Sequence, residues 1–145
     1  ASIEEIAEDL TARLQQMCQF FTVDDLKYLR KGGRISGMTA MVGSLLQIKP
    51  ILRGDEEGKI VSCGKARGKK AALVNLALRY GELALDKSAP IGIAHADDEE
   101  GTAFLIEELK KQGFSGKCLT VMYEPVTGAH VGPGTVALFF RGKHK

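Results

Sequence analysis

Apolar residues recur at steps of three and four along the first segment of the chain. The residues at these steps are Ile3, Ile6, Leu10, Leu14 and Met17. This spacing puts them on one face of an amphipathic helix, which we expect to end near Gln19. At its start, Ser2 and Glu5 stand three positions apart and fit the capping box that closes a helix N-terminus.

Strand-like and helix-like patterns alternate along the rest of the chain. The expected strands are 19–23, 48–53, 59–63, 90–96, 117–123 and 135–141, and the expected helices are 25–31, 68–85 and 99–112. The glycine-flanked acidic run 54–58 separates two of these strands, as in a hairpin. The inward face of the longest helix is expected to be Leu73, Leu76, Ala77, Tyr80 and Leu83. This order of elements predicts an α/β fold, a mixed β-sheet with helices packed on it, in a single domain over 1–145.

Composition and charge exclude several classes of function. The chain has 20 basic and 18 acidic residues and a net charge of +2, which does not favour nucleic acid or an anionic membrane as a partner. No apolar run approaches the roughly 20 residues that span a bilayer, and the polar start does not resemble a signal peptide. Three scattered cysteines, Cys18, Cys63 and Cys118, fit a reducing cytoplasm better than a disulfide framework.

Common catalytic patterns such as G-x-S-x-G, H-E-x-x-H and the P-loop are absent from the sequence. The stretch Arg30-Lys31-Gly32-Gly33-Arg34 ends a short helix that we expect Asp24 to cap. Its glycines would let the backbone approach an anion, and a guanidinium can pair with a carboxylate or phosphate. A helix C-cap followed by cations explains the same residues, and local reasoning favours it.

Two other stretches are candidates for binding. His130 stands among three glycines and a proline in 128–134, on what we expect to be a shaped loop, where its imidazole could donate to a carboxylate. A tight turn that happens to contain a histidine fits equally well. Before the longest helix stand the four cations Lys65, Arg67, Lys69 and Lys70. A solvated helix start is the usual role of such a run, and a phosphate site or a docking patch is the functional alternative.

The remaining polar and apolar clusters have ordinary explanations. His95 precedes the acidic run 97–100, which is typical of a capping or core histidine followed by a helix N-terminus, so no metal site is expected. The segment 37–46 carries Met38, Met41, Val42 and Leu45 at helical spacing. These four residues fit a protein core or the lining of an apolar ligand cavity.

Four stretches in order resemble one family, the DegV proteins. Asp24 to Ser36 is similar to its DDLxYLxxGGRIS motif, Ile48 to Leu52 to its IKPIL strand, Lys65 to Ala71 to its KxRxxKKA segment, and Gly128 to Phe140 to its GAHxGPGT motif and following strand. Val131 departs from this pattern, because members often have a threonine there. The resemblance spans nearly the whole chain and implies the C-terminal domain of a family that includes the fatty-acid-binding subunits of bacterial fatty acid kinase.

The resemblance implies a lipid carrier and not an enzyme. Members hold a long-chain fatty acid between two α/β domains, so the N-terminal domain is expected to be absent from this chain, which starts without a methionine. Arg34 and His130 would bind the carboxylate together with a threonine and a serine of that domain. The apolar set 38–45 would line the acyl tunnel. A separate cytoplasmic kinase subunit would dock near Arg67, and neither a cofactor nor a metal ion is expected.

Two alternatives from other functional classes remain open. A small α/β transferase or hydrolase would use His130 as a general base and would need a nearby nucleophile or activated water. An interaction module would instead dock an acidic partner through the segment from Lys65 to Lys70.

Overall fold

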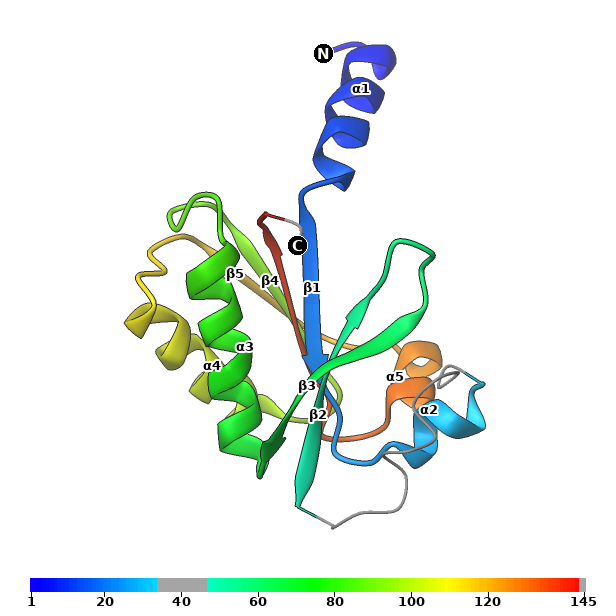
Figure 1. Cartoon of the computed structure of the whole chain (residues 1–145). Helices are drawn as coiled ribbons and strands as arrows, with labels where there is room; N and C mark the ends of the chain where they lie inside the picture. The colour runs from blue at the N-terminus through cyan, green and yellow to red at the C-terminus, as the bar shows by residue number, and fades with distance from the viewer. Residues whose placement is uncertain (34–46, 144–145) are drawn as a thin grey trace.

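A mixed β-sheet organises residues 1–33 and 47–143, which are the residues that the computed structural model describes. Its strands are β1 (Met17–Thr22), β2 (Ile48–Gly54), β3 (Ile60–Arg67), β4 (Ile91–His95), β5 (Cys118–Met122) and β6 (Val136–Arg141). They lie in the order β3-β2-β1-β6-β4-β5 (Figure 1). The β4–β5 pair is parallel, and the other neighbours are antiparallel. The predicted mixed sheet is confirmed.

Helices pack on both faces of this sheet, and one further helix stands away from it. The helices are α1 (Ile3–Leu14), α2 (Lys27–Lys31), α3 (Lys69–Leu83), α4 (Glu99–Lys111) and α5 (Pro125–Val131). The helices α3 and α4 pack on one face, and the short helices α2 and α5 lie together on the other side (Figure 1). Side chains alternate between the faces of a strand, so Phe20 belongs to the core under α3 and Phe21 to the core under α2 and α5.

Several local predictions are confirmed. All five residues expected on the inward face of the longest helix, now α3, are buried. The β2–β3 hairpin turns where expected, because Oδ1 of Asp55 accepts hydrogen bonds from the backbone N–H groups of Glu57 (3.0 Å) and Lys59 (2.8 Å). The capping box is also present: Glu5 N–H donates to Oγ of Ser2, and Ser2 N–H donates to the Glu5 carboxylate.

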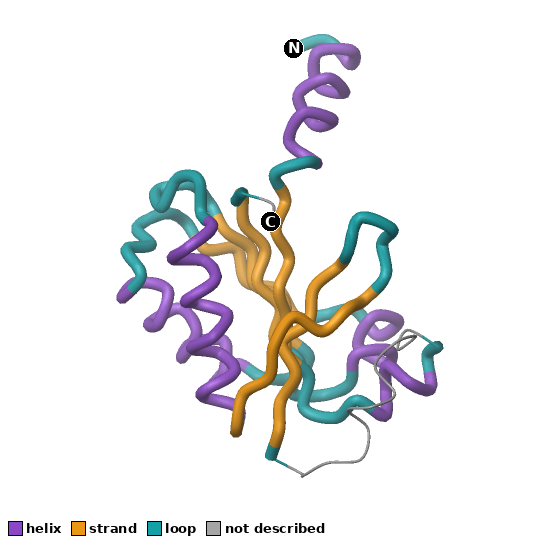
Figure 2. The backbone as a smooth tube through the Cα atoms, in the orientation of Figure 1, coloured by secondary structure: helices purple, strands orange, loops and turns teal. Residues whose placement is uncertain are grey.

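The first helix differs from its prediction in length and environment. It ends at Leu14 and not near Gln19, because Met17 already pairs with Arg141 of β6 as the start of β1. Its apolar stripe, which is typical of a core-facing helix, stays exposed: Ile3 is 81% exposed, and no residue of α1 is buried. The helix projects from the start of β1 away from the sheet (Figure 2).

Two further predictions need correction. Helix α2 begins at Lys27, and its N-cap is Leu26, not Asp24. The loop expected around His130 is partly helical, because Glu124 and Pro125 begin helix α5, which includes His130 in its last turn. The predicted helical segment with Met38, Met41, Val42 and Leu45 lies outside the described residues, as does Arg34. Among the helices of the described ranges, none combines the length and apolarity needed to cross a bilayer.

Candidate functional site

Helix α5 holds His130 by a strongly capped N-terminus. The carboxylate of Glu124 accepts hydrogen bonds from the backbone N–H groups of Val126 (2.6 Å) and Thr127 (3.0 Å), and the Thr127 hydroxyl also donates to it. These bonds, with that from the Thr127 side chain first, hold the pKa of the Glu124 carboxyl below its usual range. Pro125 at the first position has the φ that a helix start needs. The half-buried His130 is therefore presented from a short fixed helix.

The imidazole of His130 lies against the end of helix α2. A Cβ atom added at Gly32 would lie 2.5 Å from Nδ1 of His130 and 3.4 Å from Cε1. Such a separation is too short for carbon and nitrogen, so a side chain at Gly32 would require this ring to move. Gly32 stands two positions before Arg34. The structure thus brings His130 to the segment that leads into Arg34, although Arg34 itself lies beyond the described residues.

The contact between Gly32 and His130 is one of three close contacts between the segments 24–32 and 130–134. A side chain at Gly132 would overlap the ring of Tyr28, and one at Gly134 would overlap the carboxylate of Asp24. We call this set the glycine seam; it consists of Asp24, Tyr28 and Gly32 on one side and Gly134, Gly132 and His130 on the other. Each contact brings a side chain to a glycine without a gap. The seam therefore joins the first and last of the four stretches identified in the sequence.

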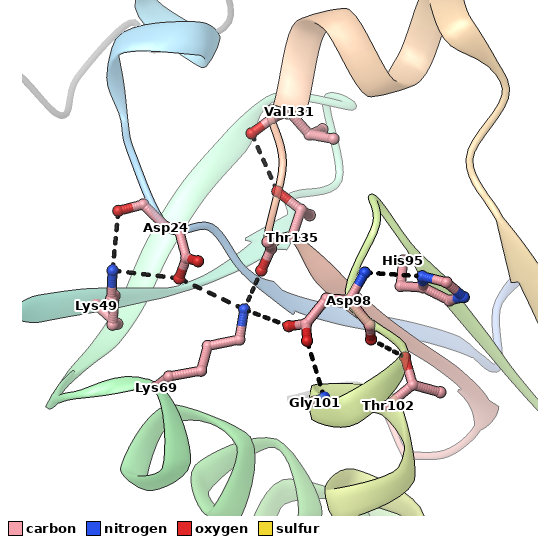
Figure 3. Close-up of polar contacts among 10 residues, drawn as sticks. Asp24, Lys49, Lys69, His95, Asp98, Gly101, Thr102, Val131 and Thr135 are labelled. Atoms are coloured by element: carbon pink, nitrogen blue, oxygen red, sulfur yellow. Dashed lines mark hydrogen bonds and ion pairs between the residues drawn. The ribbon is translucent and has the colours of Figure 1, made fainter.

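One lysine of the predicted docking segment is turned into the domain. Nζ of Lys69 lies 2.8 Å from Oδ2 of Asp98 and 3.4 Å from Oδ1 of Asp24, and it donates a hydrogen bond to the Gly134 carbonyl (Figure 3). Its side chain is 23% exposed and that of Asp98 is 17% exposed. The charge of Lys69 is therefore matched by carboxylates within the domain and is not offered to a partner.

The other three cations of that segment remain at the surface. Lys65 and Arg67 are exposed residues of β3. Lys70 is exposed at the start of α3, where its Nζ lies 5.7 Å from the centroid of the Phe104 ring, within range of a cation–π interaction. The exposed cations of the predicted docking segment are therefore Lys65, Arg67 and Lys70.

His130 lines a concavity of about 1480 Å³. Apolar side chains beside the histidine form one part of its wall: Phe21, Leu29, Ile60, Tyr123 and Val131. Burial raises the pKa of the Tyr123 phenol, which therefore remains a protonated hydrogen-bond donor near neutral pH. Sequence reasoning missed Tyr123, although a tyrosine directly after an apolar strand was a signal for it. An imidazole beside apolar walls suits an amphiphile with a negatively charged end.

His95 has the structural role expected of it. It is 5% exposed at the end of β4, and its Nδ1 accepts a hydrogen bond of 3.1 Å from Asp98 N–H. Asp98 in turn caps α4, because its Oδ1 accepts from Gly101 N–H at 2.8 Å. Within 1–33 and 47–143, no three histidine, cysteine or acidic side chains are grouped so that they could hold a metal ion.

Comparison with known proteins gives consistent matches. The model of a family described as "Uncharacterised protein, DegV family" matches residues 1–143. A DegV domain-containing protein of Clostridium perfringens is 36% identical over 146 residues, which cover 99% of this chain and 50% of that protein. The chain spans about half the length of the curated relatives it matches.

Two solved structures resemble the fold closely. A fatty acid binding DegV family protein of Streptococcus agalactiae is 34% identical, with a TM-score of 0.85, over 99% of this chain and 50% of that chain. A DegV family protein of Ruminococcus gnavus, solved with vaccenic acid, is 26% identical, with a TM-score of 0.86, over 96% of this chain and 50% of that chain. Both likenesses extend over the sheet and the helices that carry the glycine seam.

Proposed function

The chain belongs to the DegV family, and on that premise we propose that it is part of a fatty-acid carrier. In this proposal His130 and Arg34 bind the carboxylate of a long-chain fatty acid, and apolar side chains of the concavity and of the segment 38–45 contact the acyl chain. The chain corresponds to the family's C-terminal domain, and a second domain completes the site. The observation that supports this most is the contact between His130 and Gly32, close in sequence to Arg34.

The physical requirements of such a ligand match the residues. Burying an alkyl chain stabilises a complex by about 0.8 kcal/mol per methylene, so an apolar wall supplies affinity without specific contacts. A carboxylate removed from water must be paired or hydrogen-bonded, since burial otherwise costs several kcal/mol. A guanidinium and an imidazole meet that need. The S. agalactiae and R. gnavus relatives support the same ligand class, because the first is a fatty acid binding protein and the second was solved with vaccenic acid.

The test is a direct measurement of lipid in the natural protein that contains this sequence. We expect native mass spectrometry to detect bound fatty acid, and we expect oleate to bind after delipidation. His130→Ala should weaken oleate binding roughly tenfold, the loss expected for one hydrogen bond to a charged group. Val126→Ala, on the exposed side of the same helix, is the matched control and should leave affinity unchanged. A protein that neither carries nor binds a fatty acid would refute the proposal.

We also propose that a separate kinase subunit phosphorylates the bound acid, in a cytoplasm that keeps the three thiols reduced. In this proposal the chain is a carrier and not an enzyme, and the kinase docks on the exposed cations Lys65, Arg67 and Lys70. Arg67→Glu should abolish kinase-coupled turnover and leave oleate binding intact. Lys110→Glu, an exposed reversal on α4, is the control. Unchanged turnover in the Arg67 variant would exclude this docking surface.

A further inference from the structure

The four sequence stretches that resemble the DegV family meet at one carboxylate, that of Asp24. Lys49 of the second stretch places its Nζ 3.2 Å from Oδ1 of Asp24 and donates to the Asp24 carbonyl oxygen at 3.0 Å. Lys69 of the third stretch lies 3.4 Å from the same Oδ1. Gly134 of the fourth stretch leaves room for the carboxylate. Figure 3 shows the two lysines approaching Asp24 from different elements.

We propose that Lys69 is a positioning residue for the fatty-acid carboxylate site. It fixes the glycine seam, and the seam in turn fixes the imidazole of His130 against Gly32. This inference rests on the proposed function for its ligand, but the arrangement of His130 that it describes exists without a ligand. It gives Lys69 a role different from docking.

Lys69 acts on both sides of the seam at once. Its ammonium contacts Asp24, which begins one side, and the Gly134 carbonyl, which ends the other. The third contact, with Asp98, ties both sides to the start of α4. Asp98 is itself held as the α4 N-cap. The lysine therefore joins the two sides of the glycine seam to the start of α4.

Two further hydrogen bonds hold the segment that carries His130 at the same end, next to Gly134. Gly134 N–H donates to the Ala96 carbonyl at 2.7 Å, and the Thr135 hydroxyl donates to the Val131 carbonyl at 3.0 Å. With these bonds in place, moving Gly134 moves the end of helix α5. Loss of the Lys69 ammonium would remove the charged donor of the Gly134 carbonyl and the cation paired with Asp98, whereas Asp24 would keep Lys49. We therefore expect the seam to loosen at Gly134.

The experiment compares three lysine variants of the natural protein that contains this sequence. Lys69→Met keeps the aliphatic stem and removes the charge, Lys69→Arg restores a charged donor, and Lys110→Met is the control on an exposed lysine. The readouts are oleate affinity, unfolding by urea and the proton NMR signals of the imidazole rings. A His130→Ala sample assigns the His130 signal among the imidazole signals.

We expect Lys69→Met to shift the His130 signal and to weaken oleate binding roughly tenfold, as for loss of a charged hydrogen bond. Lys69→Arg should recover most of both, and Lys110→Met should change neither. A Lys69→Met protein that is less stable but keeps its His130 signal and oleate affinity would overturn the inference. If the unaltered protein binds no oleate, the proposed function fails, and the His130 signal alone decides whether Lys69 positions this side chain.

Discussion

The ring of His130 occupies the space that a side chain on Gly32 would need. The φ of Gly32 is −76°, which any residue adopts, so its own conformation does not require glycine. The requirement comes from Nδ1 of His130, 2.5 Å from the place of a Cβ. Gly32, the C-cap of α2, and His130 of α5 lie far apart in sequence, and each limits the space open to the other.

Gly32→Ala should therefore displace His130. Because the added methyl group cannot be accommodated without movement, we expect a loss of stability of roughly 1–3 kcal/mol and weaker fatty-acid binding. Gly128→Ala is the matched control: it lies on the same helix as His130, and its Cβ would meet nothing within 4 Å. That change should raise stability by up to about 1 kcal/mol. Urea denaturation and oleate titration measure both effects, and equal oleate affinity in the Gly32 variant would contradict the prediction.

Gly132→Ala tests the middle contact of the glycine seam. Gly132 has φ +82°, and its Cβ would overlap the Tyr28 ring, so a backbone cost and a steric cost add. The backbone cost alone is about 1–3 kcal/mol, because φ +82° with ψ 162° is a combination that essentially only glycine adopts. Gly68→Ala isolates it, since Gly68 has φ +85°, ψ 160° and open space around it. We expect urea denaturation to give a clearly larger loss at Gly132, and Tyr28→Ala in the same chain should remove the excess. Equal losses at the two glycines would show that the Tyr28 contact is loose.

The exposed helix α1 should respond differently to mutation from the buried helix α3. Leu10 is 57% exposed, so Leu10→Ala should change the free energy of unfolding of the 145-residue chain by less than about 0.5 kcal/mol. Leu76 is fully buried, and Leu76→Ala should cost roughly 2–5 kcal/mol. Chemical denaturation of the two variants measures this contrast. A large loss at Leu10 would mean that the apolar stripe of α1 is covered in solution.

Acid should weaken the N-terminal cap of helix α5. Hydrogen bonds from Thr127 lower the pKa of Glu124 below its ordinary 4.5, so the folded state favours the ionised carboxyl. A lowered pKa contributes stability above the unfolded value, and that contribution is lost as the pH falls through the folded value. Urea unfolding near neutral pH and below 4.5 should show a smaller decline for Glu124→Gln than for the unaltered chain. The other carboxyls titrate in both proteins, so an identical decline would contradict the role of Glu124.

Local sequence patterns predicted much of the secondary structure and the buried face of α3. The spacing of Leu73, Leu76 and Tyr80 predicted the buried face of α3, and the glycine-flanked acidic run predicted the hairpin. Such features depend on contacts within a few residues, which local patterns encode directly. The four family-like stretches also identified the segments that form the glycine seam and the contacts of Asp24 with Lys49 and Lys69. They did not show how these segments meet.

Contacts between segments far apart in sequence set the roles of individual side chains. The stripe of α1 has a core-like pattern yet contains no buried residue, because burial depends on what packs against a helix and not on its periodicity. His130 lies in a helix because the N-terminal cap formed by Glu124 and Pro125 outweighs the low helix propensity of the neighbouring glycines. Lys69 points into the domain because the fold places the carboxylates of Asp24 and Asp98 beside it. These two residues lie 45 positions before it and 29 positions after it in the sequence. Long-range electrostatics of this kind leave no periodic trace in a sequence.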